Sequence, residues 1–240
     1  IKTFKSNTFG TLSILECLRA LKNNCSVVLI TSDKSYKNLE IKRGYKENDL
    51  LGGVDPYSSS KASAELIIQT YLSSFLKTKK NISLAIARAG NVIGGGDWSS
   101  DRLIPDCIKS WSKNKKVLLR NPDSTRPWQH VLEALSGYLI LAVHLSENKK
   151  LNGQAFNFGP SNLNSYSVLD VVKRMKNYWK NVSWKKNKKN NSPYESNLLK
   201  LNSKKAKKKL NWKSILTFKE TINLAITWYK IFYDKKISIY

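Results

Sequence analysis

The residues of this chain that could do chemistry lie in three short polar stretches. Residues 31–34 follow one apolar run, and residues 90–98 follow another. Between them, residues 57–61 start a predicted helix directly after Asp55 and Pro56. Polar residues at the ends of two strands, with a helix between, are typical of parallel sheets whose carboxyl ends face a ligand. This arrangement predicts an enzyme.

Tyr57 and Lys61 lie four residues apart, and so they share one face of the predicted helix. A tyrosine ionises near pH ~10, but a nearby ammonium and the positive end of a helix both favour the phenolate. We therefore expect the pKa of Tyr57 to be lowered, so that Tyr57 can act as a general base towards a hydroxyl group. The alternative is an ordinary surface pair, which has the same spacing.

Asp33 is expected at the carboxyl end of the first strand, where its side chain would face the crevice. The alternative is that Ser32 or Asp33 only caps a turn or a helix. The presence of Tyr57 further along the chain favours a catalytic role for Asp33.

Three consecutive glycines, Gly94 to Gly96, stand close to Asn91 and predict a loop whose backbone approaches a ligand closely. Arg102 and Arg126 flank this loop and its return. Both are candidates for a clamp on a diphosphate, because a guanidinium binds phosphate oxygens in pairs. A surface salt bridge is the alternative for each.

The size and composition of the chain limit its class. At 240 residues it can bury a substantial core, as one domain or as two closely packed ones. No apolar run has the roughly 18 residues that a membrane span needs, and the first residues do not resemble a secretory signal. Cys17, Cys25 and Cys107 have no metal-ligand spacing. We expect reduced thiols, a cytoplasmic protein and no metal site.

The net charge of +25 raises the possibility of nucleic-acid binding. Only seven of the 42 basic residues are arginine, the residue that binds phosphates and base edges in bidentate fashion. The lysines are spread along the chain among many asparagines. We therefore expect solvated basic faces and no specific nucleic-acid partner, and we keep a basic nucleic-acid binder as an alternative.

The hydrophobic pattern predicts alternating strands and helices. Expected helices cover residues 7–23, 56–75, 104–111, 131–145 and 218–233, with a further one capped by Ser167. Expected strands cover residues 27–30, 84–87, 117–119 and 155–158. Residues 36–55 are predicted to be a surface loop, and residues 181–191 a basic linker. The alternation indicates an α/β fold with a doubly wound, Rossmann-type parallel sheet.

One part of such a fold is absent from the sequence. No Gly-x-Gly-x-x-Gly turn follows any predicted strand, and the chain starts with Ile1. We therefore expect the first strands of the sheet to be missing through an N-terminal truncation. A chain without them is expected neither to retain a dinucleotide nor to turn over a substrate.

The motifs resemble those of the extended short-chain dehydrogenase/reductases, which share a Tyr-x-x-x-Lys pair and a Ser or Thr at the end of the preceding strand. Within this NAD-dependent epimerase/dehydratase group, the chain is most similar to the CDP-glucose 4,6-dehydratases. The similarity extends over nearly the whole chain, in residues 32–34, 55–61, 87–98, 101–106, 120–122, 126–131, 157–160, 199–201 and 210–212.

The resemblance implies a reaction with NAD as cofactor and the nucleotide sugar CDP-glucose as substrate, in the supply of cell-surface polysaccharide. Tyr57 would take the proton of the glucose 4-hydroxyl, Lys61 would bind the nicotinamide ribose, and Ser32 would bond the 4-oxygen. Asp33 would protonate the departing 6-hydroxyl. Lys34 stands where related dTDP-glucose enzymes carry a glutamate, so the group that removes the C5 proton stays open.

The resemblance also implies the rest of the site and the domain division. Substrate-binding residues would be Asn91, Arg102, Leu103, Ile104 and Arg126. Residues 1–94 and about 126–160 would form the NAD-binding domain, and residues 95–125 and about 161–240 a smaller substrate domain. A homo-oligomer without membrane association is expected. The alternatives are a dehydratase or epimerase for another nucleotide sugar, and an inactive module that only binds nucleotide sugars.

Overall fold

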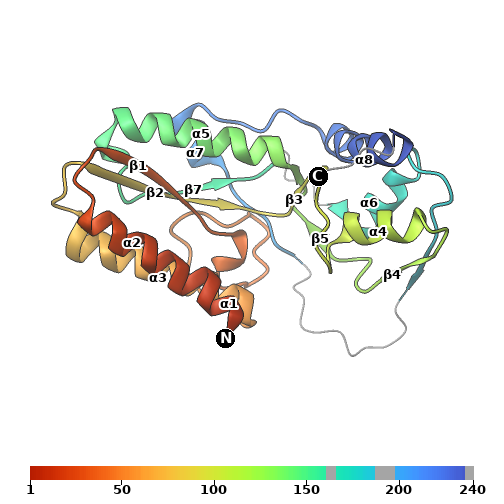
Figure 1. Ribbon diagram of the computed structural model, residues 1–240, viewed down its shortest axis with the longest axis horizontal. Helices are drawn as coiled ribbons and strands as arrows, with labels where there is room; N and C mark the ends of the chain where they lie inside the picture. Colours follow the sequence, from red (N-terminus) through yellow and green to blue (C-terminus); the bar gives the residue numbers. More distant parts are fainter. Residues whose placement is uncertain (161–165, 187–197, 236–240) are drawn as a thin grey trace.

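A computed structural model of the chain describes residues 1–160, 166–186 and 198–235. Its first half is a three-stranded parallel sheet with strand order β1-β2-β7, formed by β1 (Cys25–Ile30), β2 (Ile82–Ala89) and β7 (Ala155–Phe158). Helices α2 (Gly10–Ala20) and α3 (Pro56–Tyr71) cover one face of this sheet, and α5 (Val131–Glu147) and α7 (Lys204–Leu210) cover the other (Figure 1). The predicted Rossmann-type α/β fold is confirmed.

The central strand β2 is buried along its whole length. Alternate side chains point to opposite faces of a strand. Accordingly, Ile82, Leu84 and Ile86 pack in the cluster that includes the α2 and α3 side chains. Ala85 and Ala87 pack in the cluster on the other face, with α5. Strands buried on both faces are continuously apolar, which explains the predicted strand at residues 84–87 and its longer extent in the structure.

Local sequence signals set the start of α3. The Asp55 carboxylate accepts hydrogen bonds from the backbone N–H groups of Tyr57 and Ser58, at 2.9 and 3.0 Å, and Pro56 occupies the first helical turn. The helix continues into a π-helical turn, Leu72–Leu76. Likewise, α2 follows a short helix α1 (Lys2–Phe4) and a π-helical turn, Lys5–Phe9, so this first helix starts earlier than predicted.

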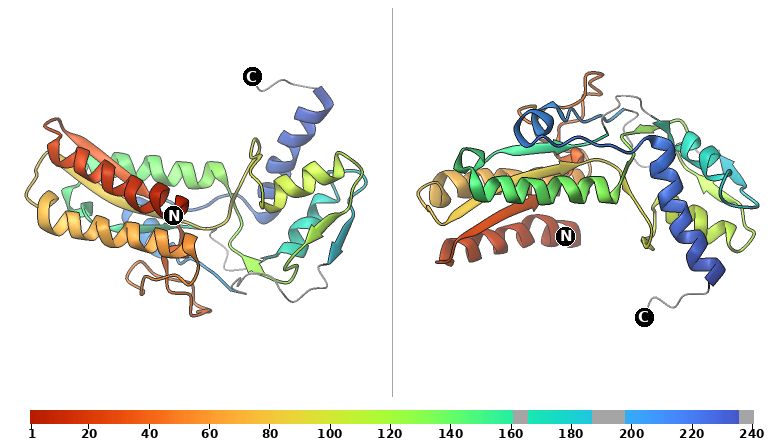
Figure 2. Two further views of the ribbon diagram at one scale, coloured as in Figure 1. Left: turned by 60° about the horizontal axis from the view of Figure 1, so that its bottom comes forward. Right: turned by 90° about the horizontal axis from the view of Figure 1, so that it is seen from above.

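The second half of the molecule is built around α4 (Leu103–Trp111), α6 (Val168–Met175) and α8 (Phe218–Lys235) (Figure 2). These helices share a core with the strand β4 (Val117–Leu119). The Ser167 side chain caps α6 in a reciprocal capping box with Asp170, as the predicted cap requires.

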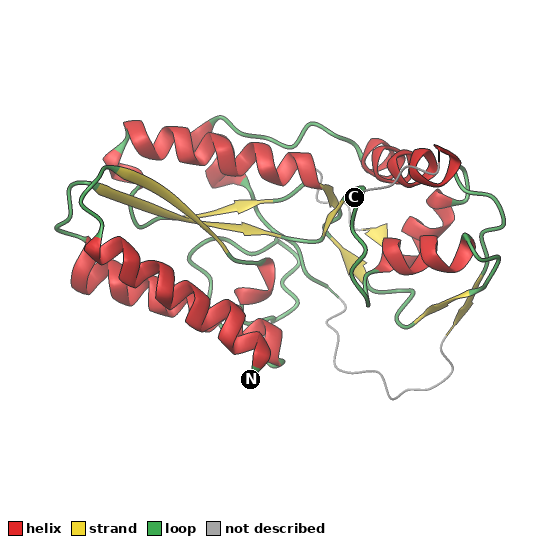
Figure 3. Cartoon of the chain, in the orientation of Figure 1, coloured by secondary structure: helices red, strands yellow, loops and turns green. Residues whose placement is uncertain are grey.

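The prediction of a linker over residues 181–191 is wrong for its described part. Strand β9 (Trp184–Lys186) pairs in parallel with β4 there (Figure 3). Trp184 packs against the core of the second half, and this burial outweighs the polar character of the surrounding lysines. Residues 187–191 lie outside the described residues.

Two short strand pairs lie where the chain passes between the halves. Strand β3 (Val92–Ile93) pairs with β6 (Gln129–His130), and β5 (Thr125–Arg126) pairs with β8 (Tyr166–Ser167). The loop after β2 and its return are thereby held against each other.

The expected domain division needs one correction. Residues about 161–240 were assigned to the second half, but α7 and Trp212 pack on the sheet beside Phe156 and Phe158. Leu199 and Leu201 pack with Tyr36 and Tyr45, in the loop between β1 and α3. Apolar residues at these positions complete the core of the sheet half, so the chain returns to that half before it forms α8.

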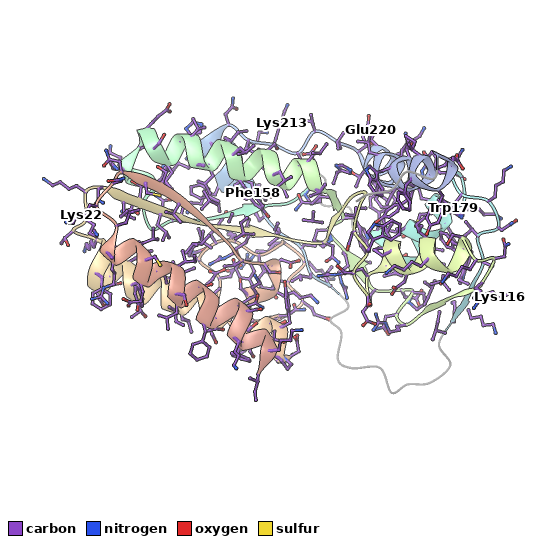
Figure 4. All side chains as sticks on the ribbon, viewed as in Figure 1. Lys22, Lys116, Phe158, Trp179, Lys213 and Glu220 are labelled. Atoms are coloured by element: carbon purple, nitrogen blue, oxygen red, sulfur yellow. The ribbon has the colours of Figure 1, made fainter. Side chains whose placement is uncertain are left out.

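The basic side chains are dispersed. Figure 4 shows Lys22, Lys116 and Lys213 at separate outer edges of the molecule, and all three are exposed, whereas Phe158 and Trp179 lie inside the two halves. Among the described residues, no helix is long and apolar enough to span a membrane, and no group of three His, Cys, Asp or Glu side chains could hold a metal ion.

The three glycines of this loop have a packing role that the sequence did not predict. A Cβ on Gly95 would stand 2.1 Å from the Trp228 ring of α8, and one on Gly94 would stand 2.6 Å from Val131. Gly96 has a φ of +76°. Gly94 and Gly95 are needed because the loop packs against α5 and α8 without room for side chains, and Gly96 because of its positive φ. Gly94 also lines a pocket.

We predict that Gly95→Ala lowers the free energy of unfolding by about 1–3 kcal/mol, because the added methyl group overlaps the Trp228 ring. Gly10→Ala is the matched control, since its Cβ would meet only ordinary contact at 3.8 Å. That variant should gain about 0.5–1 kcal/mol, because alanine is the better helix former. Urea unfolding measures both, and equal stability of the two variants would contradict the packing role of Gly95.

Candidate active site

A cavity of about 580 Å³ opens at the carboxyl ends of β1 and β2, between the two halves of the molecule. The sheet half and the second half each contribute predicted site residues to its wall. The predicted residues that line it are Ser32, Asp33, Lys34, Tyr57, Asn91, Arg102, Leu103, Ile104 and Arg126. Lys61 is the one predicted site residue outside this lining. Parallel strands place ligand sites at this edge, as the sequence analysis predicted.

Ser32 and Asp33 occupy the turn that follows β1. Ser32 caps the short helix Asp33–Ser35: its hydroxyl accepts a hydrogen bond from the Lys34 N–H at 3.2 Å. The same hydroxyl donates to Asp33 Oδ1 at 2.9 Å. Capping, which the sequence analysis raised as the alternative to catalysis, thus occurs together with a position in the cavity wall.

The Asp33 carboxyl is almost completely buried, with 2% of its surface exposed. Its Oδ2 atom has no hydrogen-bond partner among the described residues. Burial raises the pKa of Asp33 to about 6, against the opposing effects of the Ser32 hydroxyl and the charges of Lys34 and Arg126. A carboxyl with such a pKa holds its proton through mildly acidic pH, and it can donate that proton to a leaving group.

Gly90 explains how Asp33 is enclosed. A Cβ at this position would stand 2.7 Å from Pro127 and 3.2 Å from Asp33 Oδ2. The end of β2 therefore lies close against both the carboxyl and the returning loop only because residue 90 is a glycine.

Tyr57 lies in the first turn of α3 and lines the cavity with 38% of its surface exposed. The Lys34 ammonium stands 5.8 Å from the centre of the Tyr57 ring. Lys61 follows one turn later on the same helix face and is half-buried. Its ammonium makes no hydrogen bond within the described part of the chain, and burial lowers its pKa, although the nearby Glu65 opposes this.

The expected lowering of the Tyr57 pKa is not observed. Burial raises the pKa of Tyr57, and the charges of Asp33 and Asp55 act in the same direction. The Ser32 hydroxyl and the Arg102 charge lower it, but they do not compensate. The prediction considered only the local effects of Lys61 and the helix end, whereas desolvation and the carboxylates arise from the tertiary structure.

The opposite wall of the cavity is built from the start of α4. Arg102 directly precedes this helix, and Leu103 and Ile104 form its first turn. The backbone N–H groups at a helix start attract phosphate oxygens. Arg102 forms no ion pair with any described residue, which disfavours the surface salt bridge considered above. Arg126 is buried, with 3% exposure, and lines the same cavity.

Arg120 and Tyr138 are among the cavity residues that were not assigned a role from the sequence. Arg120 lines the cavity and pairs with Asp101 at 3.2 Å across its rim. Tyr138 reaches the cavity from α5, and burial raises its pKa to about 12. Arg120 lies within a motif that the sequence analysis had noted. Tyr138 belongs to an apolar helix, and its neighbours give no indication of a site.

The protein has a parallel α/β sheet with Ser, Tyr and Lys at its carboxyl edge, and this edge faces a second half that carries basic residues. These features define a Rossmann-type protein of the extended short-chain dehydrogenase/reductase class. Residues 1–225 match the family described as GDP-mannose 4,6 dehydratase. The chain belongs to this family.

The similar proteins include a CDP-glucose 4,6-dehydratase from Salmonella typhimurium, 42% identical over 96% of this chain and 65% of that protein. A CDP-paratose 2-epimerase from Salmonella typhi is 24% identical over 73% of this chain and 56% of that protein. The chain thus spans about two thirds or less of the length of these relatives.

Two solved structures have the same fold. One is a UDP-glucuronic acid 4-epimerase from Bacillus cereus in complex with UDP-glucuronic acid and NAD, with a TM-score of 0.79, 20% identity, and coverage of 93% of this chain and 67% of that chain. The other is a dTDP-glucose 4,6-dehydratase from Bacillus anthracis in complex with NAD. It has a TM-score of 0.76, 24% identity, and coverage of 95% of this chain and 68% of that chain.

The buried Asp33 carboxyl should make stability depend on pH. Its folded-state pKa of about 6 lies above the ordinary aspartate value of 3.8, so the folded state holds the proton more tightly and stability falls as pH rises through this window. We predict that Asp33→Asn, which cannot ionise, is more stable than the parent by up to about 3 kcal/mol at pH 7.5, and that this gain vanishes near pH 4. Urea unfolding across this pH range measures the difference.

Asp49→Asn provides a control of opposite sign. Hydrogen bonds from Arg43 lower the pKa of Asp49, so its stabilising effect is present above the unfolded pKa and is lost as pH falls. This variant should be less stable than the parent at neutral pH and should approach it in acid. A destabilised Asp33→Asn at neutral pH would show that the carboxyl is held ionised.

Proposed function

We propose that the protein acts in the NAD-dependent dehydration of CDP-glucose to CDP-4-keto-6-deoxyglucose and water. The observation that carries this proposal is the buried Asp33 carboxyl, which lines the same cavity as Ser32 and Tyr57. An epimerase needs groups that handle the 4-hydroxyl, but a dehydratase also needs an acid for a leaving hydroxyl. The 42% identity to a CDP-glucose 4,6-dehydratase supports the same substrate.

The cofactor fits the residues present at its nicotinamide end. Lys61 is half-buried and has no hydrogen-bond partner among the described residues, as expected of a group that binds a ribose hydroxyl. Tyr57 lies one turn away on the same helix face. Bound NAD would supply the hydride-transfer chemistry between C4 and C6 of the sugar.

The side chains of the turn after β1 and of α3 would bind the sugar hydroxyls and transfer their protons. Ser32 would hydrogen-bond the sugar 4-oxygen, and Tyr57 would take the proton of the 4-hydroxyl. The pKa of Tyr57 is raised without ligands, so we propose that the charge of the bound cofactor and the approach of Lys61 favour the phenolate. The resulting 4-ketone acidifies C5, and Asp33 then protonates the 6-hydroxyl as water leaves.

The second half of the molecule would bind the nucleotide part of the substrate. Arg102, together with the N–H groups at the start of α4, and the buried Arg126 would hold the diphosphate. Asn91, Leu103 and Ile104 complete this part of the wall. We leave the base that removes the C5 proton unassigned. Lys34 stands at the position where a glutamate is expected, and a lysine cannot replace it as a carboxylate base.

We also propose that the protein is a cytoplasmic homo-oligomer. The three cysteines are free. Apolar side chains are exposed on or beside the outer surfaces of α2 and α3, with exposures of 59% for Phe9, 49% for Ile14 and 55% for Leu66. Burial of such residues between two copies would be favourable.

The described chain by itself is expected not to turn over a substrate, so activity is measured here and below with a version extended upstream of Ile1 through a glycine-rich turn. This version and NAD are incubated with CDP-glucose, dTDP-glucose, UDP-glucose and GDP-mannose. We expect loss of water from CDP-glucose alone or at much the highest rate, measured by mass spectrometry of the products. Turnover of another sugar without CDP-glucose would replace the proposed substrate. Binding of CDP-glucose with no turnover would indicate a binding module instead.

The catalytic roles are separable by single substitutions. Tyr57→Phe removes only the ionisable oxygen, so kcat should fall by about 10²–10⁴-fold with little change in CDP-glucose binding. Asp33→Asn should still allow oxidation at C4, so the 4-keto-glucose nucleotide should accumulate and be detected in quenched mixtures. Tyr71→Phe is the control, because Tyr71 is the last residue of the same helix, does not line the cavity and donates its hydroxyl to Glu16. Wild-type turnover by Asp33→Asn would remove Asp33 from the mechanism.

A further inference from the structure

A buried ion pair lies directly behind the proposed catalytic turn. Glu65 on α3 has no exposed surface, and Arg88 on β2 has 1% exposed. The Arg88 Nε atom donates to Glu65 Oε1 and Oε2 at 2.8 and 3.0 Å, and its Nη2 also donates to Oε2. Neither residue lines the cavity, and neither has a role in the reaction proposed above.

The Glu65 carboxylate also binds both ends of the segment that holds the proposed catalytic residues. Its Oε1 atom accepts a hydrogen bond from Thr31 Oγ1 at 2.6 Å and lies 2.9 Å from the hydroxyl of Ser35. The Ser35 hydroxyl is also 2.7 Å from the carbonyl oxygen of Ser32. Thr31 and Ser35 immediately precede and follow the run from Ser32 to Lys34.

The helix that carries Glu65 also carries Tyr57 and Lys61. These three residues are spaced by four, so they follow one another along one side of α3. A contact from Glu65 to residues 31 and 35 therefore connects the Tyr57 helix to the turn that bears Ser32 and Asp33.

Arg88 makes this arrangement possible, because an isolated buried carboxylate would be strongly destabilised. Arg88 is itself held on its other side. Its Nη1 atom donates to the Tyr36 hydroxyl at 2.7 Å and to the Glu47 carbonyl oxygen at 2.9 Å. The Tyr36 hydroxyl donates in turn to Asn157 Oδ1 at 2.8 Å, at the end of β7.

We propose that Glu65, supported by Arg88, is a positioning residue that sets the distance and orientation between the Ser32–Asp33 turn and Tyr57. This inference rests on the proposed function for its catalytic consequence. The two groups must act on neighbouring atoms of one sugar, and a displacement of about 1 Å can cost 10²-fold in rate. Glu65 and Arg88 lie outside the cavity lining, and Thr31, which lines it, is altered in the test only at its hydroxyl, so substrate binding should be unaffected.

The test uses the Thr31 hydroxyl, because Thr31→Val removes one hydrogen bond to Glu65 and leaves the ion pair intact. We expect kcat for CDP-glucose dehydration to fall by about 10- to 100-fold with KM unchanged. Thr31→Ser keeps the hydroxyl and should restore the rate. Thr70→Val is the matched control, because this hydroxyl bonds the Leu66 carbonyl oxygen on the exposed side of the same helix. A rise in KM equal to the loss in kcat would overturn the proposal.

Hydrogen exchange tests the same contact without catalysis. The N–H groups of Ser35 and Tyr36 bond the carbonyl oxygens of Ser32 and Asp33, at 3.1 and 3.3 Å. In Thr31→Val and in Glu65→Gln, these amides should exchange at least about tenfold faster, while amides of α8 are unchanged. Unchanged exchange at residues 35 and 36 in both variants would overturn the positioning role. Faster exchange in a protein that does not dehydrate CDP-glucose would leave the positioning role in place and refute the proposed function.

Discussion

The arrangement around the cavity depends on the buried pairing of Glu65 with Arg88. Two opposite charges removed from water are tolerable only when their hydrogen-bonding capacity is satisfied. Here the Glu65 carboxylate accepts hydrogen bonds from the guanidinium and from the hydroxyls next to the β1 turn. The Arg88 guanidinium also donates to the Tyr36 hydroxyl and to a backbone carbonyl oxygen. One interaction therefore joins the helix α3, the central strand β2 and the ends of β1 and β7.

The same burial that orders this edge of the sheet also sets the chemistry of the groups above it. Asp33 lines the cavity with Gly90 close against its carboxyl, and loss of solvent raises its pKa to about 6. Burial also raises the pKa of Tyr57, and the neighbouring carboxylates raise it further. The second half of the molecule brings Arg102 and Arg126 to the other wall. A buried carboxyl, a serine hydroxyl and two arginines thus face one cavity.

Much of the fold and of the site could be predicted where the signal is local. The strand at 84–87 and the Asp55 cap depend on apolar runs and on a side chain two or three residues from its partner. The membership of the family followed from motifs that span nearly the whole chain, and the match over residues 1–225 confirms it. The errors lie where a contact with a distant residue determines the structure. Strand β9 forms where the partly buried Trp184 packs against the core of the second half, and residues 198–212 return to the sheet because Trp212 packs on Phe158.

By itself, the sequence determined the order of the sheet strands and of the longer helices, the α/β class and the residue types at the carboxyl ends of β1 and β2, because these follow from periodicity and near-neighbour chemistry. Only the tertiary structure decided the protonation preferences of Asp33 and Tyr57, the contact of Gly95 with Trp228, and the pairing of Glu65 with Arg88. Desolvation, close packing and charge pairing all depend on which residues from distant parts of the chain exclude water from a given atom, and that is settled only when the chain has folded.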